Sequence, residues 1–295
     1  MSPQGRAVSR RGDPGWRRPR RHDAHRPCLQ LAKRAVDPQD RSEGGSLIAA
    51  FPQGAPHVPV GVPTRLPYLL TDAEGIPLDL IEGDVRFVIA HDDTEVAELD
   101  VSPRSEGIPR AYLPLQHTFD SVGIHDVTAT YQGKEMTSQI QVFPQAEVVS
   151  PVVGQQLPAA PTATDSNSLE VDPICTQVPQ CPFHSVSLTD ALGQGKSIVL
   201  LVATPAYCQT SFCGPTLGNL MDMVNGRDDL TVIHSEVYKN PKAAKGDLAA
   251  APLAPLPEKY DLLLEPVLYV TDAKGTITTR ADATIDRSEM AEVIG

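Results

Sequence analysis

The stretch from residue 197 to 224 limits the fold of this chain more than any other. Residues 198–203 form an unbroken apolar run that ends at a Thr-Pro pair. Such a run predicts a strand buried on both faces, as in a parallel or mixed α/β sheet. Cys208 and Cys213 follow, and apolar residues then recur at helical spacing, which predicts a helix over the sheet: Leu217, Leu220, Met221 and Val224. The two cysteines therefore lie between the carboxyl end of a central strand and a helix N-terminus, where open α/β sheets place their chemistry.

Charge is divided unevenly along the chain. Residues 1–45 carry 11 Lys and Arg against 5 Asp and Glu, whereas the whole 295-residue chain has a net charge of −12. The remainder is strongly acidic, which argues against nucleic acid or an anionic membrane surface as a partner of the folded part. A chain of this length is sufficient for two ordinary domains.

Composition divides the chain into four segments. Residues 1–45 are rich in Arg, Pro and Gly without periodicity, and they are predicted to be a disordered basic leader. Residues 46–144 contain about seven short strand patterns separated by turn signals, which predicts an immunoglobulin-like β-sandwich. Residues 145–172 are predicted to be an exposed, Pro-rich linker. Residues 173–295 have the pattern of a mixed α/β domain with the order strand, helix, strand, hairpin, helix.

The predicted sandwich offers no catalytic pattern. Alternation of apolar and polar residues is clear from Val85 to Ile89, and the pair Gln132-Gly133 predicts a hairpin. The segment has no cysteine, so it lacks the inter-sheet disulfide of antibody-type domains. Its histidines show no ligand spacing and are predicted to lie on the surface: His57, His91, His117 and His125.

Four of the five cysteines fall into two close pairs, and close pairs indicate disulfides, a metal site or a redox couple. Cys175 and Cys181 bracket five residues, and they are predicted to form a static disulfide that ties the linker to the last domain. His184 and His234 are candidates for an acid–base or metal role. The alternative is that each is a loop or strand histidine with satisfied hydrogen bonds.

The spacing of Cys208 and Cys213 constrains the local backbone. Residues five apart on a continuous helix have Cα atoms roughly 8–9 Å apart, beyond the ~7 Å that a disulfide bridges. Residues 209–212 must therefore form a loop, or the helix must unwind locally on oxidation. If the helix begins near Gly214, its positive N-terminus lowers the pKa of Cys213, and Cys208 is the resolving or solvent-side partner. If it begins at Thr204, Cys208 is the nucleophile, so the choice stays open.

These residues resemble the active-site segment of thioredoxin-like proteins. The triplet Cys213-Gly214-Pro215 is similar to the start of the family's Cys-Gly-Pro-Cys motif, although Thr216 stands where the second cysteine would be. Pro266 occupies the place of the family's cis-proline. The resemblance covers about 120 residues. It implies a thioredoxin fold for residues 173–295, with a substrate groove lined by Tyr207, Gly214, Pro215, Glu265 and Pro266.

The whole layout resembles exported thioredoxin-domain proteins that carry an N-terminal immunoglobulin-like domain. The cysteine spacing is also similar to that of atypical peroxiredoxins. The peroxiredoxin Pro-x-x-x-Thr-x-x-Cys pattern is incomplete, because Thr210 is in place but Ala206 stands where proline is needed. The expected fold class is therefore α+β with two domains, an all-β immunoglobulin-like sandwich followed by an α/β thioredoxin fold.

The function predicted from the sequence is that of a thiol–disulfide oxidoreductase, with Cys208 and Cys213 as the catalytic pair and protein thiols, protein disulfides or a small thiol as partners. The first alternative is a thiol peroxidase, and the second is a non-catalytic binding or copper-delivery module on the same fold. No spacing demands a metal or a cofactor, and none is predicted.

Paired cysteines indicate an extracytoplasmic setting, in the cell envelope or secreted, because stable disulfides persist in oxidising compartments. No stretch has the apolar core of a secretory signal. One alternative for residues 1–45, besides a disordered leader or a basic tail, is that they are not the natural start and that an export signal or membrane anchor has been lost.

Overall fold

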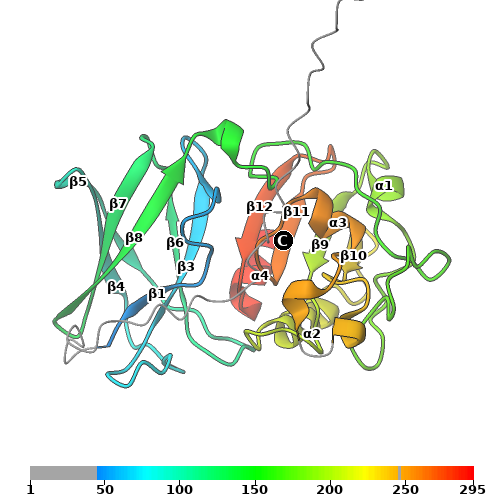
Figure 1. Ribbon diagram of the computed structural model, residues 1–295, viewed down its shortest axis with the longest axis horizontal. Helices are drawn as coiled ribbons and strands as arrows, with labels where there is room; N and C mark the ends of the chain where they lie inside the picture. Colours follow the sequence, from blue (N-terminus) through cyan, green and yellow to red (C-terminus); the bar gives the residue numbers. More distant parts are fainter. Residues whose placement is uncertain (1–44, 245–246) are drawn as a thin grey trace, which may run out of the picture.

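A computed structural model describes residues 45–244 and 247–295 (Figure 1). The predicted leader, with Cys28, lies outside the described residues except for Gly45. The described chain has more strand than helix, and it forms a β-sandwich beside a second unit built on a mixed sheet. None of the helices in this part of the chain is long and apolar enough to cross a membrane.

The sandwich consists of two sheets around one apolar core. One sheet has the order β1 (Leu47–Ala49), β3 (Thr64–Leu70), β6 (Leu113–His117). The other has the order β2 (Val58–Pro59), β8 (Lys134–Phe143), β7 (Gly123–Tyr131), β4 (Val85–His91), β5 (Thr94–Val101). Fully buried aromatic and aliphatic side chains from both sheets meet between them: Leu66, Tyr68, Phe87, Ile89, Leu115 and Val127.

Local sequence patterns predict most of this sandwich correctly. Along β4, Val85, Phe87 and Ile89 are buried. The predicted hairpin is β7–β8, with Gln132 and Gly133 both at positive φ in its two-residue turn. Strand β6 is not predicted, because Pro114 interrupts its short apolar pattern.

The second unit is built on a four-stranded sheet in the order β10 (Leu230–Ser235), β9 (Ser197–Val202), β11 (Val267–Thr271), β12 (Ile277–Asp282). Strand β10 is parallel to β9, whereas β11 is antiparallel to both β9 and β12. Strand β9 is buried on both faces, as its apolar run predicts: alternate side chains enter two separate cores.

Helices cover both faces of this sheet (Figure 1). The helices α2 (Cys213–Met223) and α4 (Arg287–Ile294) share one core with β9 and β11. The short helices α1 (Leu188–Ala191) and α3 (Pro255–Lys259) contribute to the core on the other face. Three 3₁₀ turns complete the described elements: η1 (Gln145–Glu147), η2 (Pro241–Ala244) and η3 (Leu248–Ala250).

The segment 145–172, predicted to be an exposed linker, packs against the second unit instead. Its backbone pairs with β12, since Gly154 N–H donates to the Ile277 carbonyl (2.9 Å) and Ile277 N–H donates to the Gln155 carbonyl (2.8 Å). Leu157 and Ala160 are buried in the core beneath α1 and α3. Proline content indicates stiffness and the lack of periodicity indicates irregular structure, but neither excludes packing against a sheet.

A buried ion pair joins the two units. Arg65 of β3 donates to Glu289 of α4 through Nε (2.6 Å) and Nη2 (2.7 Å), and Nη2 also donates to the Thr284 carbonyl (2.7 Å). Tyr112 donates a short hydrogen bond to the same carboxylate. The guanidinium and carboxylate thus have several partners each, which buried charges need.

The sequence Asp286-Arg287-Ser288-Glu289 has the pattern of a capping box, but at the start of α4 the box is only half formed. The Asp286 carboxylate accepts from Glu289 N–H (2.8 Å), but Glu289 turns toward Arg65. Asp286 N–H donates instead to the Tyr112 hydroxyl (2.9 Å), which the sandwich supplies. A long-range partner has therefore replaced the local one.

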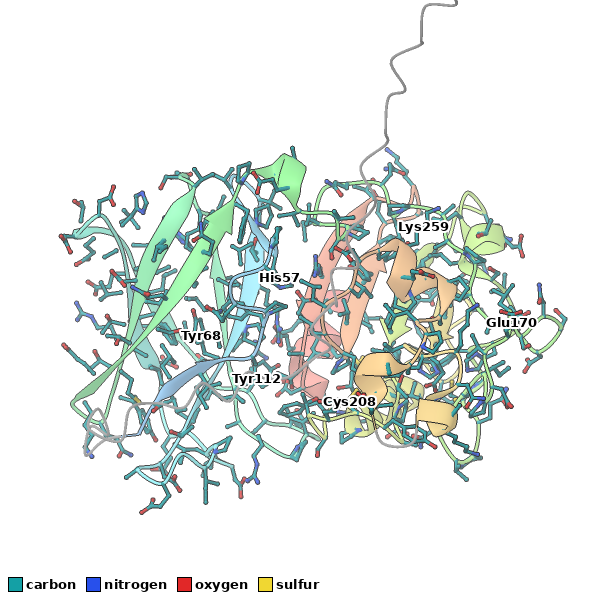
Figure 2. The ribbon with its side chains drawn as sticks, viewed as in Figure 1. His57, Tyr68, Tyr112, Glu170, Cys208 and Lys259 are labelled. Atoms are coloured by element: carbon teal, nitrogen blue, oxygen red, sulfur yellow. A yellow bond between two sulfur atoms is a disulfide. The ribbon has the colours of Figure 1, made fainter. Side chains whose placement is uncertain are left out.

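The prediction that the sandwich histidines lie on the surface is wrong for His57 and His125, which are both buried. His57 Nε2 lies 3.1 Å from the Asp282 carboxylate of β12, so it belongs to the contact between the units. Figure 2 shows His57 and Tyr112 on the side of the sandwich that faces the second unit. Burial lowers the pKa of His57. His125 stacks on His91, with ring centroids 4.3 Å apart.

The Arg65→Met substitution is expected to lower the free energy of unfolding by about 3–5 kcal/mol, because it leaves the Glu289 carboxylate buried without its cation. The matched control is Arg86→Met, which removes the exposed Arg86–Glu98 pair and is expected to cost less than about 1 kcal/mol. Urea denaturation measures both. Equal costs for the two variants would contradict a structural role for the buried pair.

Candidate functional site

The site begins where β9 ends. Strand β9 ends at Val202, and Ala203 and Thr204 remain buried beyond it. The backbone then turns, with Tyr207 N–H donating to the Thr204 carbonyl (3.0 Å). This turn carries the chain to Cys208 at the carboxyl edge of the sheet.

A disulfide joins Cys208 and Cys213, whose Cα atoms are 5.9 Å apart. Residues 209–212 form a loop, and Ser211 in it has a φ of +63°. Helix α2 begins at Cys213, so Pro215 falls in its first turn, where proline is tolerated. Of the two layouts that the sequence leaves open, the structure has the one in which the helix begins beside Cys213.

The two sulfurs differ in exposure. Cys213 is 0% exposed, whereas Cys208 is half-buried. Thr210 Oγ1 lies 3.3 Å from Cys208 Sγ. A reagent arriving from solvent therefore meets the sulfur of Cys208 first.

A buried carboxyl group lies behind the disulfide. Glu265 Oε2 accepts from Thr204 N–H (2.5 Å) and lies 3.6 Å from Cys213 Sγ. Burial, with a smaller contribution from the nearby Glu236, raises the pKa of Glu265 to about 8 against the opposing effect of the Thr204 hydrogen bond. The Glu265 side chain is therefore mainly a neutral acid near neutral pH, beside the buried sulfur.

The residues predicted to line a substrate groove divide into two sets. Tyr207, Gly214 and Pro215 are half-buried around the disulfide. Glu265, which is 3% exposed, and Pro266 are buried beneath it, so they do not line an open groove. The Glu265–Pro266 peptide bond is cis.

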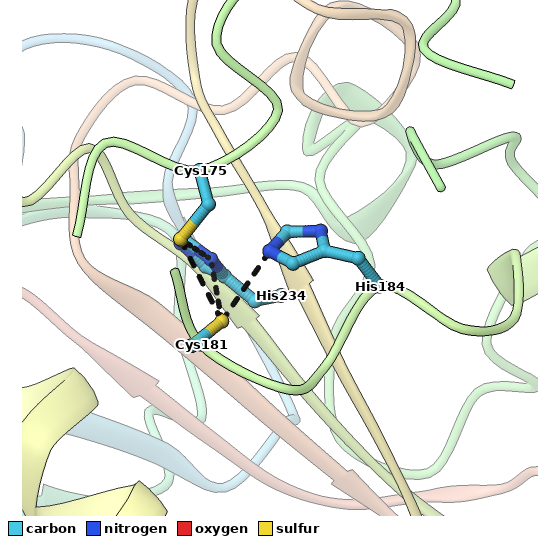
Figure 3. Close-up of side chains that lie close together, drawn as sticks. All are labelled: Cys175, Cys181, His184 and His234. Carbon is cyan, nitrogen blue, oxygen red and sulfur yellow. Dashed lines mark hydrogen bonds between the residues drawn. The ribbon is translucent and has the colours of Figure 1, made fainter. Parts of the chain in front are cut away.

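The predicted structural disulfide between Cys175 and Cys181 is wrong in this structure: both are free thiols, with Sγ atoms 3.7 Å apart. Each sulfur faces an imidazole nitrogen as well as the other sulfur. His234 Nδ1 lies 3.7 Å from Cys175 Sγ and 3.4 Å from Cys181 Sγ. His184 Nε2 lies 3.3 Å from Cys181 Sγ (Figure 3).

The sequence patterns did not predict that Cys175, Cys181, His184 and His234 form one cluster. The hydrogen bond from Cys181 lowers the pKa of the Cys175 thiol, and the same bond raises the pKa of the Cys181 thiol. His184 stands only three residues after Cys181, which is a weak local signal. His234 lies on β10, where its backbone N–H donates to the Phe183 carbonyl (3.2 Å), so a contact between segments far apart in the sequence brings it to the cysteines.

Comparisons with known proteins add little to this geometry. No protein-family model matches the chain, and no curated protein matches it in sequence. Similar solved structures include the Lin-41 filamin domain (15% identity, 35% of this chain and 95% of that chain, TM-score 0.24). Another is the ZirS C-terminal domain (11% identity, 48% of this chain and 87% of that chain, TM-score 0.24). A third is titin domain M4 (14% identity, 35% of this chain and 99% of that chain, TM-score 0.21). At these TM-scores the likenesses carry no argument about function.

Replacement of Glu265 by Gln is expected to change how stability depends on pH. The pKa of Glu265 is about 8 in the folded state against an ordinary 4.5, so the folded state holds a proton that the unfolded state releases between these values. The free energy of unfolding of the wild type should therefore fall, relative to Glu265→Gln, as pH rises from about 5 to about 8.

Urea denaturation of the oxidised proteins at both pH values measures this difference. Glu236, the other buried carboxyl near Glu265, is present in both proteins, so its titration largely cancels. The exposed Glu98→Gln is the control, and its difference from wild type should stay constant. A pH-independent difference for Glu265→Gln would show that this carboxyl titrates normally.

Proposed function

We propose that the protein is a thiol–disulfide oxidoreductase whose redox pair is Cys208 and Cys213. One observation carries the proposal: the half-buried Cys208 is bonded to the fully buried Cys213, which begins helix α2 and has the Glu265 carboxyl 3.6 Å from its sulfur. A disulfide that only stabilises the fold needs neither neighbour.

The proposed reaction begins at the exposed sulfur. A thiolate of the partner attacks Cys208 Sγ in line with the disulfide, and a new S–S bond forms as the Cys208–Cys213 bond breaks. The electron pair of the broken bond goes to Cys213 Sγ. The Glu265 carboxyl, 3.6 Å away, is placed to supply a proton to that sulfur.

The second step completes the exchange. A second thiolate of the partner attacks the partner's sulfur in the mixed disulfide, so the partner becomes a disulfide and Cys208 leaves as a thiolate. The partner loses two electrons and the Cys208–Cys213 pair gains them. The same steps in reverse reduce a partner disulfide.

Position at the first turn of α2 favours Cys213 as the leaving group. The first N–H groups of a helix lack intrahelical acceptors, and the aligned peptide dipoles stabilise negative charge there. A leaving thiol with a lowered pKa departs faster. We therefore assign Cys208 as the sulfur that forms the mixed disulfide and Cys213 as the buried, resolving sulfur, which reverses the roles expected from the start of the helix alone.

The order of elements supports a thioredoxin-like assignment for residues 173–295. Strand β9 leads into α2 and then into the parallel strand β10, and the hairpin β11–β12 and helix α4 follow. The triplet Cys213-Gly214-Pro215 opens α2, and Pro266 directly precedes β11. We propose the sandwich as a spacer or binding module attached to this redox unit.

We propose an extracytoplasmic location. Two predicted disulfides supported this location in the sequence, and one of them, Cys208–Cys213, is formed in the structure. Cys208–Cys213 is the only pair bonded within residues 45–244 and 247–295. Its partners would be protein dithiols, protein disulfides or a small thiol.

Trapping the mixed disulfide tests the assignment. The Cys213→Ser variant of the full chain, mixed with glutathione disulfide, is expected to accumulate a glutathione adduct on Cys208, because the resolving sulfur is absent. The Cys208→Ser variant is the matched control and should form its adduct far more slowly, since Cys213 is buried. Mass spectrometry of peptides identifies the modified residue.

Both single variants should reduce exchange activity, measured as insulin disulfide reduction, to the level of the double variant. Wild-type activity no higher than that of the double variant would contradict the proposed function. Faster modification of Cys213 than of Cys208 would contradict the assigned roles while leaving the function standing.

A further inference from the structure

A second group of reactive side chains lies apart from the disulfide. Cys175, Cys181, His184 and His234 are 7%, 2%, 1% and 0% exposed. They come from the segment that precedes α1 and from strand β10, and Figure 3 shows their sulfur and nitrogen atoms converging on one point. One ligand atom from each residue lies within 4.8 Å of all the others.

The distances match a tetrahedral metal centre. A zinc ion with Zn–S bonds of about 2.3 Å and Zn–N bonds of about 2.0–2.1 Å separates two sulfur ligands by about 3.8 Å, and a sulfur from a nitrogen by about 3.5 Å. The two sulfurs here are 3.7 Å apart. The three close sulfur–nitrogen distances are 3.3, 3.4 and 3.7 Å.

Hydrogen bonding fixes the ring of His234 in the orientation that a ligand needs. Its Nε2 lies 3.0 Å from the Ala203 carbonyl, and only a protonated Nε2 can donate there. The other nitrogen, Nδ1, then carries a lone pair that faces both sulfurs. A carbonyl in this position is a usual outer partner of a metal-bound histidine. His184 presents Nε2 to Cys181, and its Nδ1 has no partner in the described part of the chain.

Neighbouring contacts hold the cysteine segment in place. Thr176 follows Cys175 directly in the sequence. The Glu236 carboxylate accepts hydrogen bonds from the Thr176 N–H (2.6 Å) and from the Thr176 hydroxyl, Oγ1 (3.3 Å). Thr176 Oγ1 in turn accepts from Ala206 N–H (3.1 Å), in the turn that leads to Cys208. Thr176 thus connects the cluster to the turn that leads to Cys208.

We propose that Cys175, Cys181, His184 and His234 bind one zinc ion with a structural role. Two thiolates and one Zn²⁺ give a centre without net charge, which suits a buried position. Thiolate and imidazole together are the ligands that zinc prefers, and four protein ligands leave no open coordination position for catalysis. The ion would fasten the segment before α1 to β10. The inference does not depend on the redox function, because it uses none of the same sulfurs.

Metal content of the purified full chain tests the site. Protein expressed with added zinc and purified under a non-thiol reductant is expected to contain about one zinc per chain. The Cys208→Ser/Cys213→Ser variant should retain it, as should His117→Gln, which changes a histidine of the sandwich. Cys181→Ser and His234→Gln should each lose most of it.

A second measurement does not depend on whether those variants fold. In the Cys28→Ser/Cys208→Ser/Cys213→Ser variant, Cys175 and Cys181 are the only thiols. A thiol reagent should react with them slowly before zinc removal and rapidly after a chelator is added. Cobalt(II) added to the metal-free protein should give the visible absorption of a tetrahedral site with sulfur ligands.

Three results would overturn the proposal. The first is protein without stoichiometric zinc whose Cys175 and Cys181 are joined by a disulfide. The second is zinc that is lost on replacing Cys208 and Cys213 but kept in His234→Gln. The third is a thiol reaction rate that the chelator does not change.

Discussion

The structure of the second unit depends on how strand β9 ends. At that end the Ala203 carbonyl binds His234 Nε2, and Thr204 N–H donates to Glu265. Thr204 Oγ1 also accepts from Val237 N–H (3.0 Å), which ties the residues after β10 to the same point. The adjacent residues Ala203 and Thr204 therefore contact both clusters. One cluster is the Cys208–Cys213 disulfide with Glu265, and the other is the group of two cysteines and two histidines that includes His234. Because β9 is buried on both faces, this strand end has little freedom to move.

The sandwich supports this arrangement from the side of α2 and α4. Arg65 and Tyr112 fix Glu289 in the first turn of α4, and Asn219 of α2 donates to the Gly107 carbonyl (3.1 Å). Helix α2 is the one that begins at Cys213. Contacts of the sandwich thus reach the helix that begins at the buried sulfur, although they do not touch that sulfur.

The sequence predicted correctly what local patterns determine. The apolar run of β9, the turn Gln132-Gly133 and the proline two residues after Cys213 each specify a conformation through neighbouring residues. The free state of Cys175 and Cys181 and the burial of His57 were not predictable in this way. Each depends on a partner far away in the chain, His234 and Asp282 respectively, and spacing alone cannot distinguish a disulfide from two ligands of a shared centre.

The reduction potential of the Cys208–Cys213 pair tests the central claim most directly. Equilibration of the full chain with glutathione buffers of graded ratio, followed by alkylation and mass spectrometry of the peptide that carries both cysteines, measures it. A pair used for exchange is expected to have a potential between about −270 and −120 mV, the range of known thiol–disulfide exchange proteins. A potential below about −300 mV, typical of disulfides that only stabilise a fold, would contradict the account.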